Sequence, residues 1–139
     1  MNPFPTLALC AFGLLASACQ VKPYTPPPRP VTVTSVDIET NEFHGRPEAW
    51  ATIRGHLSTS AAQFAGAKQS REGRHIRIEM LERTPRGAEL APDLVDSPYF
   101  ERRIPIDVIG LDAGPCTLSV NEFETVFQLP DLTGNGTSS

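Results

Sequence analysis

The sequence predicts an all-β protein, an antiparallel β-sandwich of about seven strands, that follows an export signal and a proline-rich linker. Apolar and polar residues alternate with a period of two through most of the chain after residue 30. This is the pattern of strands that bury one face. Clusters of Gly, Pro and Asn separate the alternating runs and predict tight turns. About 100 residues remain once the signal and the linker are removed, which is the size of one small domain.

The first 18 residues have the features of a secretory signal peptide. Residues 1–21 contain no charged side chain, and residues 6–16 form an apolar run. This run is too short to span a membrane, which takes about 20 apolar residues. Small residues follow it, as a signal peptidase requires. We therefore expect cleavage between Ala18 and Cys19.

Small residues that end directly on a cysteine resemble the lipobox of bacterial lipoproteins. The resemblance implies that Cys19 is the new N-terminus and carries diacylglycerol and a fatty acyl chain such as palmitate. Gln20 in the next position implies sorting to the outer membrane. Ala16 stands where Leu is usual, and no Lys or Arg precedes the apolar run. The alternative is therefore a soluble periplasmic or secreted protein, cut at the same bond.

Charge and cysteine content narrow the possible partners. All Lys, Arg, Asp and Glu residues lie after the predicted cleavage site, so the net charge of -4 belongs to the mature chain. An acidic chain has no electrostatic reason to bind nucleic acid. Only Cys19 and Cys116 remain after cleavage. If Cys19 is acylated, Cys116 is a lone thiol and is expected to be a small buried residue; a disulfide between them is the alternative.

The mature chain is expected to have three parts. Residues 19–30 carry repeated prolines, which favour extended polyproline II and predict a linker of about 3.1 Å per residue. Residues 31–130 are the expected sandwich, and residues 131–139 a flexible tail. Within the sandwich, residues 31–39 alternate as a first strand, with a bulge near Ser35 that keeps the apolar side chains on one face.

The following elements are predicted in order. A loop is expected at residues 41–47 and a strand at 49–57, in which Gly55 marks a bulge or a close contact. Residues 58–71 are rich in alanine, but the turn signal that follows favours a strand over a helix. A clear strand then covers residues 75–80.

The last third of the chain predicts a crossover and a closing hairpin. Residues 84–98 are expected to connect the two sheets, with one helical turn near Leu94. Residues 99–110 form an edge strand, because Pro105 has no N–H to donate. A final hairpin joins strands 116–120 and 123–129 through a two-residue turn at Asn121 and Glu122, with one apolar face on each strand.

The segment that starts at Leu111 has the sequence Leu-Asp-Ala-Gly-Pro-Cys-Thr-Leu-Ser-Val-Asn. It resembles the Leu-x-Ala-Gly-x-Tyr-x-Val-x-Val-Asn pattern of immunoglobulin-like and fibronectin-like domains in exported bacterial proteins, with Cys116 in place of the Tyr. Arg54-Gly55-x-Leu57, Ile76-x-Ile78 and Ile104-Pro105-Ile106 fall in matching places, so the resemblance covers about residues 48–129. It implies a largely uncharacterised family of small bacterial lipoproteins with an immunoglobulin-like sandwich and no catalytic chemistry.

No motif for catalysis, metal binding or a cofactor is present. The histidines His44, His56 and His75 lack the short spacing of a metal site. His56 and His75 would face each other only if their strands were neighbours. The best candidate for a contact surface is a basic cluster on the predicted hairpin, interrupted by acids, which consists of Lys68, Arg71, Arg74 and Arg77.

These observations favour a non-enzymatic lipoprotein of the cell envelope, in which the sandwich contacts another envelope protein or helps an assembly. The membrane would be its second partner, through Cys19. The alternative is a tethered inhibitor of an envelope hydrolase such as a protease or lysozyme, which would present residues 58–64 or 84–98. A metal-dependent or thiol enzyme is the least supported class.

Overall fold

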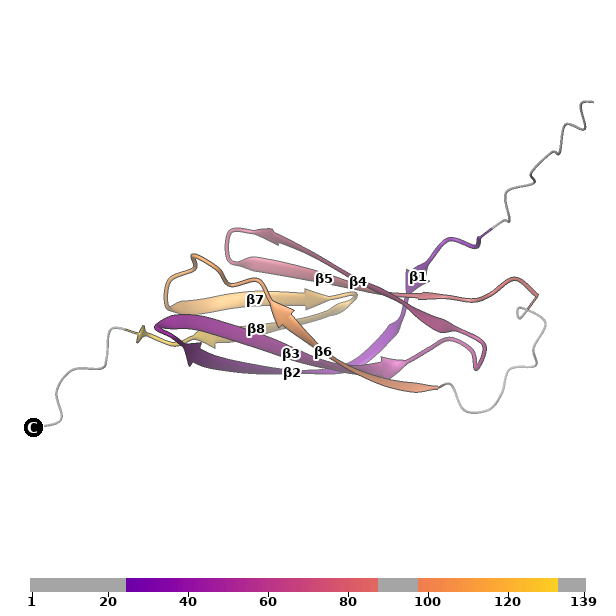
Figure 1. The fold of residues 1–139 in the computed structure, drawn as a ribbon, viewed down its shortest axis with the longest axis horizontal. Coiled ribbons are helices and arrows are strands. Elements are labelled where there is room, and N and C mark those ends of the chain that lie inside the picture. Colours follow the sequence, from indigo (N-terminus) through magenta and orange to yellow (C-terminus); the bar gives the residue numbers. More distant parts are fainter. Residues whose placement is uncertain (1–24, 88–97, 133–139) are drawn as a thin grey trace, which may run out of the picture.

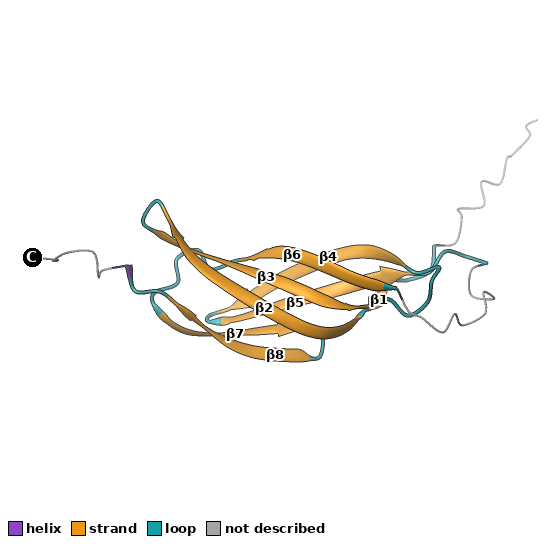
Figure 2. Cartoon of the chain, turned by 90° about the horizontal axis from the view of Figure 1, so that it is seen from below, coloured by secondary structure: helices purple, strands orange, loops and turns teal. Residues whose placement is uncertain are grey.

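A computed structural model describes residues 25–87 and 98–132, which form two β-sheets packed face to face (Figure 1). Sheet A contains β1, β4, β5, β7 and β8, and sheet B contains β2, β3 and β6. Figure 2 shows the same strands in a second view. The prediction of an all-β sandwich is confirmed. The strands are β1 (Arg29–Pro30), β2 (Thr32–Phe43), β3 (Arg46–His56), β4 (Gln63–Glu72), β5 (His75–Arg83), β6 (Tyr99–Ile106), β7 (Gly114–Val120) and β8 (Phe123–Leu129).

One pair of strands is parallel, whereas the prediction was an antiparallel sandwich. β5 and β7 run in the same direction, from the pair His75 and Thr117 to the pair Ile78 and Val120. The other strand pairs are antiparallel. The chain leaves sheet A after β5 and crosses sheet B once as β6, so it re-enters sheet A at the end where β5 began. The predicted crossover between the sheets is therefore confirmed.

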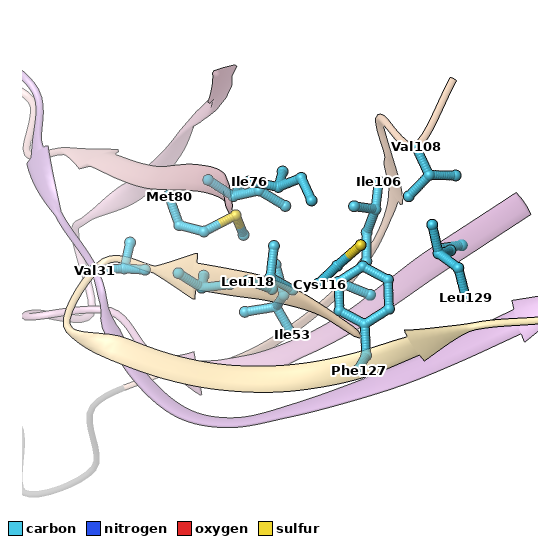
Figure 3. Close-up of a cluster of buried hydrophobic side chains, with 14 of the residues drawn as sticks. Val31, Ile53, Ile76, Met80, Ile106, Val108, Cys116, Leu118, Phe127 and Leu129 are labelled. Atoms are coloured by element: carbon cyan, nitrogen blue, oxygen red, sulfur yellow. The ribbon is translucent and has the colours of Figure 1, made fainter. Parts of the chain in front are cut away.

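The core fills the space between the two sheets (Figure 3). Alternate residues of each strand face inward, as the period-two pattern predicted. Cys116 is 1% exposed, is a free thiol and pairs across strands with Phe127, so its predicted place in the core is confirmed. The largest of the side chains that are almost completely buried are Ile53, Ile76, Ile78, Met80, Leu118, Glu82, Val120 and Cys116.

Most strand boundaries agree with the alternation. The bulge near Ser35 is confirmed, because the register of β2 against β3 shifts between Val33 and Ser35. The predicted loop at residues 41–47 is wrong. β2 and β3 continue until a two-residue turn at His44 and Gly45, whose φ angles are 52° and 72°. Positive φ at both positions matches the twist of the two strands, and the sequence lacks the Asn-Gly pair that usually indicates such a turn.

Two further expectations concern the segments before β1 and β4. Arg29 and Pro30 pair with β5 as β1, so sheet A begins inside the predicted linker. Between residues 58 and 71, the strand alternative is confirmed from Gln63 onward. Pro105 lies on β6, which is an edge strand of sheet B, as predicted.

Asn121 joins the end of β7 to β1. Its φ of 52° turns the chain toward β8. Its Oδ1 accepts a hydrogen bond from the Met80 N–H at 2.8 Å. Its Nδ2 donates to the carbonyl oxygens of Val31 at 2.8 Å and Met80 at 3.1 Å. Met80 lies between the part of β5 that pairs with β7 and the part that pairs with β1. The Asn121 side chain therefore supplies the hydrogen bonds of the β5 backbone at this gap.

The sandwich has two ends, which are named here by what lies at them (Figure 1). The linker end holds β1, the end of β5 and the start of β6. The hairpin end holds the turn between β2 and β3, the turn between β4 and β5, and residues 107–113. The predicted signal peptide, Cys19, the helical turn near Leu94 and most of the predicted tail lie outside the described residues. Within the described ranges, no helix is long and apolar enough to cross a membrane.

Candidate functional site

The predicted basic cluster does not form one surface. Lys68 and Arg77 are exposed, and their alternation with the buried Ile76 and Ile78 places Arg77 on the outer face of sheet A. Neither makes a hydrogen bond or ion pair with another residue in the part of the chain that the structure describes. Arg71 instead pairs with the inward position of Ile76, so it extends past the edge of the sandwich.

Arg71 and Arg74 hold the hairpin end together. Arg71 Nη1 donates to the carbonyl oxygen of Ile109 at 2.8 Å and lies 3.3 Å from Asp107 Oδ1. Arg74 Nε donates to the carbonyl oxygen of Pro115 at 2.7 Å, and its Nη2 to another carbonyl at 3.0 Å. Backbone carbonyls at the end of a strand need donors, and these two guanidinium groups supply them. Their charges are thus directed to the fold rather than to a partner.

A polar network crosses the outer face of sheet A. His75 Nε2 lies 2.7 Å from Ser119 Oγ, and Ser119 Oγ lies 3.2 Å from Glu124 Oε2. A hydroxyl has one proton to donate, and a carboxylate can only accept. Ser119 therefore donates to Glu124 and accepts from His75. Nucleophile activation needs the opposite order, in which the serine proton passes to the imidazole.

His56 and His75 lie on β3 and β5 in different sheets, so their strands are not neighbours and the two side chains do not face each other. His56 packs edge-to-face against Tyr99, with 5.9 Å between the ring centroids. His75 lines two adjoining depressions of about 390 and 780 Å³ together with Arg77. Glu79 and Glu124 also line the larger one. Because both signs of charge alternate there, this face does not favour a polyanion.

Glu82 is a buried carboxylate at the linker end. Its side chain is 1% exposed and accepts hydrogen bonds from Arg29 Nε at 3.1 Å and the Ser58 N–H at 2.9 Å. Arg29 Nη2 also donates to Ser58 Oγ at 2.7 Å. A buried carboxylate is stable only when it is paired and hydrogen-bonded. The sequence held a signal for this site, because Glu82 continues the inward series of Ile76, Ile78 and Met80.

The linker makes a second contact with the sandwich. Arg83 Nε donates to the carbonyl oxygen of Pro26 at 3.1 Å. The linker therefore contacts the last two residues of β5. Arg29 pairs with Glu82, and the Pro26 carbonyl accepts from Arg83. Ser58 belongs to one of the two segments predicted for an inhibitor, and its backbone N–H is already bound to Glu82.

Charged pairs cover the outer face of sheet B. Arg54 lies between Glu101 and Asp37, and its Nε is 2.7 Å from Glu101 Oε2. The hydrogen bond to Glu101, followed by that to Asp37, raises the pKa of Arg54 above its ordinary value. Arg103 Nη2 is 2.9 Å from Glu39 Oε2, and its Cζ lies 4.7 Å from the centre of the Trp50 ring.

A smaller depression of about 310 Å³ lies at the hairpin end and is lined by the start of β3, the end of β6 with the residues after it, and one residue of β4. Its lining includes Pro47, Pro105 and Ile109 together with Glu48 and Trp50. Ile109 is 81% exposed. Sequence reasoning missed this site, because its residues come from three separate segments. Among residues 25–87 and 98–132, no group of three or more His, Cys, Asp or Glu residues could hold a metal ion.

Most of the sandwich matches one known domain family. Residues 51–129, more than half of the chain, match the model of the ORF11 beta-sandwich domain. The chain belongs to this family. The match runs from within β3 to the end of β8 and supports the predicted β-sandwich. The matched residues of the ORF11 beta-sandwich domain begin after β1 and β2. They also begin after Glu48 and Trp50 of β3. No curated protein and no solved structure matches the chain significantly.

Proposed function

We propose that the protein is a non-enzymatic lipoprotein of the bacterial cell envelope, whose sandwich domain contacts another envelope protein. Lipidation is supported by the small residues before Cys19 and the prolines after it. The observation that carries the proposal is the attachment of the linker to one end of the sandwich. Arg29 pairs there with the buried Glu82, and Arg83 holds Pro26.

This attachment gives the domain a defined orientation. Pro26 lies seven positions after Cys19, and a fully extended chain spans at most about 25 Å over that distance. A lipid on Cys19 would therefore keep the linker end close to the membrane. The hairpin end, at the opposite end of both sheets, would face away from it (Figure 1).

The described surfaces suit contact better than catalysis. Ser119 gives its proton to Glu124 rather than to His75, so this network lacks an activated nucleophile. By contrast, Phe43 and Ile109 are 57% and 81% exposed at the hairpin end. Exposed apolar side chains beside a depression are typical of surfaces that bind proteins.

Intact mass spectrometry of the full chain, expressed in a bacterium and purified from membranes, tests the proposal. The expected mass corresponds to an N-terminus at Cys19 with diacylglycerol and one or more acyl chains. Cys19→Ser should move the protein to the soluble fraction, whereas Cys116→Ser, a change in the core, should leave a folded protein in the membrane. An unmodified Cys19, or a Cys19→Ser variant that stays in the membrane, would contradict lipidation. Density-gradient separation of the two membranes tests the outer-membrane location.

A further inference from the structure

The depression at the hairpin end lies where β6 leaves sheet B. The last pair between β3 and β6 joins Ala49 to Ile106. After Ile106 the chain turns toward Arg71, which binds the carbonyl oxygens of Asp107 and Ile109. β3 begins earlier, at Arg46. Its first residues therefore have β2 on one side and no β6 residue on the other.

Apolar groups form most of the walls of this depression. Pro47 and Pro105 contribute rigid rings, Ile109 is 81% exposed, and Trp50 is a further lining residue. Covering such surfaces with apolar atoms removes apolar area from water, which is favourable. A volume of about 310 Å³ can hold one long side chain or a short piece of extended peptide.

Two neighbouring polar groups of the depression are already bonded. Asp107 forms an ion pair with Arg71 at 3.3 Å. The Gln69 side chain donates to the carbonyl oxygen of Pro105 at 3.1 Å and accepts from the Asp107 N–H at 2.9 Å. Arg103, which lies over one face of the Trp50 ring, is neutralised by Glu39. These groups leave no charge for a ligand.

Glu48 differs from these groups. Its side chain is half-buried, and neither a hydrogen bond nor an ion pair joins its carboxylate to another residue within the described ranges. Arg46, two residues earlier on the same strand, does not pair with it. The indole N–H of Trp50 likewise has no acceptor there. The depression thus presents one uncompensated negative charge and one free donor among apolar walls.

We infer that this depression binds a Lys or Arg side chain on an apolar segment of the partner protein. The cation pairs with Glu48, and the aliphatic stem of the ligand packs against Pro47 and Ile109. The Trp50 indole N–H donates to a backbone carbonyl of the same segment. The inference rests on the proposed contact function and gives that contact a surface and a chemistry.

Trp50 is the only tryptophan in the chain and reports on this site directly. The test titrates the full chain with acetyl-Leu-Lys-Leu-amide and records tryptophan emission, with acetyl-Leu-Glu-Leu-amide as the matched acidic peptide. The lysine peptide should give a saturable change in emission. The acidic peptide should bind at least about five-fold more weakly, because its charge has the sign of Glu48.

Two variants on the same hairpin separate charge recognition from a general effect of the surface. Glu48→Gln should weaken binding of the lysine peptide about five-fold. Glu42→Gln removes an exposed carboxylate outside the depression and should leave binding unchanged. Equal binding of both peptides, or equal binding by the Glu48→Gln protein, would overturn the inference. So would the absence of any saturable change in emission.

Sedimentation velocity tests whether a second copy of the chain occupies the depression instead. A dimer that Ile109→Ser dissociates would mean that the depression is a self-interface, and this would also overturn the inference. The outcome is independent of lipidation. The peptide titration can succeed if Cys19 proves unmodified, and it can fail if the protein is a lipoprotein that uses another surface.

Discussion

Two carboxylates, one at each end of the sandwich, are used in opposite ways. At the linker end, the carboxylate of Glu82 is 1% exposed and fully hydrogen-bonded, with a partner that comes from the linker itself. At the hairpin end, Glu48 is half-buried and unpaired within the described residues, beside an isoleucine that is 81% exposed. The first end therefore uses its charges to fix the chain to the fold, and the second leaves a charge available.

This difference separates stability from recognition. Changes at the linker end should lower the free energy of unfolding. Changes in the depression around Glu48 should alter binding and leave the free energy of unfolding almost unchanged. Each variant below tests that division by urea unfolding of the full chain, which yields the free energy and the m-value.

Gly55→Ala should have the largest effect. A Cβ atom at Gly55 would lie 2.0 Å from the Thr32 carbonyl oxygen and 2.9 Å from the Phe100 ring, so β2 or β6 must move. We expect a loss of about 3 kcal/mol or more. Gly45→Ala, in the turn at the hairpin end, is the matched control. It meets no atom within 4 Å and suffers only from its φ of +72°, so it should lose about 1 kcal/mol. Equal losses would mean that β2 and β3 do not approach as closely as described.

Asn121→Ala should come next. It removes the acceptor for the Met80 N–H and two donors to carbonyl oxygens, so backbone groups at the edge of β5 lose their partners. We expect a loss of about 2.5 kcal/mol. Asn121→Asp keeps the acceptor but sets a carboxylate against two carbonyl oxygens, and it should be no better than alanine. A milder effect of aspartate would show that the two donated bonds contribute little.

Arg29→Ala should destabilise the linker end less, because the Arg29 side chain is 56% exposed and water can partly replace it. The buried Glu82 would keep only its bond from Ser58, and we expect a loss of about 2 kcal/mol. Arg86→Ala, on an exposed arginine two residues beyond Thr84, should change stability by less than about 0.5 kcal/mol. If both variants unfold at the same urea concentration, β1 is not held by this ion pair.

Ile109→Ser should have the smallest effect on stability. With 81% of its surface exposed, Ile109 has little apolar area to lose, and the change should stay within about 0.5 kcal/mol. The same variant should weaken the lysine peptide in the fluorescence titration. A marked loss of stability without any loss of binding would invert the division between the two ends.

Alternation of apolar and polar residues was enough to place most strands and the core. It identified the inward positions of β5 and the place of Cys116, because both depend only on neighbours along one strand. The same alternation marks Glu82 as inward, yet nothing local reveals that its partner Arg29 lies 53 residues earlier.

The sequence did not predict which distant strands pair, or in which register. Arg71 was predicted to be a surface cation, but in register it lies opposite the buried Ile76 and therefore extends over the edge of the sandwich. Lys68, in the outward register, is exposed. The depression around Glu48 lies where β6 stops pairing with β3. No local sequence pattern shows where two distant strands stop pairing. The predicted basic cluster was thus composed of residues with two different roles.

The parallel pairing of β5 with β7 also constrains how the chain folds. Parallel neighbours cannot be joined by a tight turn, and here the chain between β5 and β7 contributes β6 to the opposite sheet. The strands of sheet A are therefore interrupted along the chain by strands of sheet B. Neither sheet is a contiguous piece of sequence that could form first and wait for the other. We expect the domain to fold as one cooperative unit, at the slow rate typical of topologies with distant contacts.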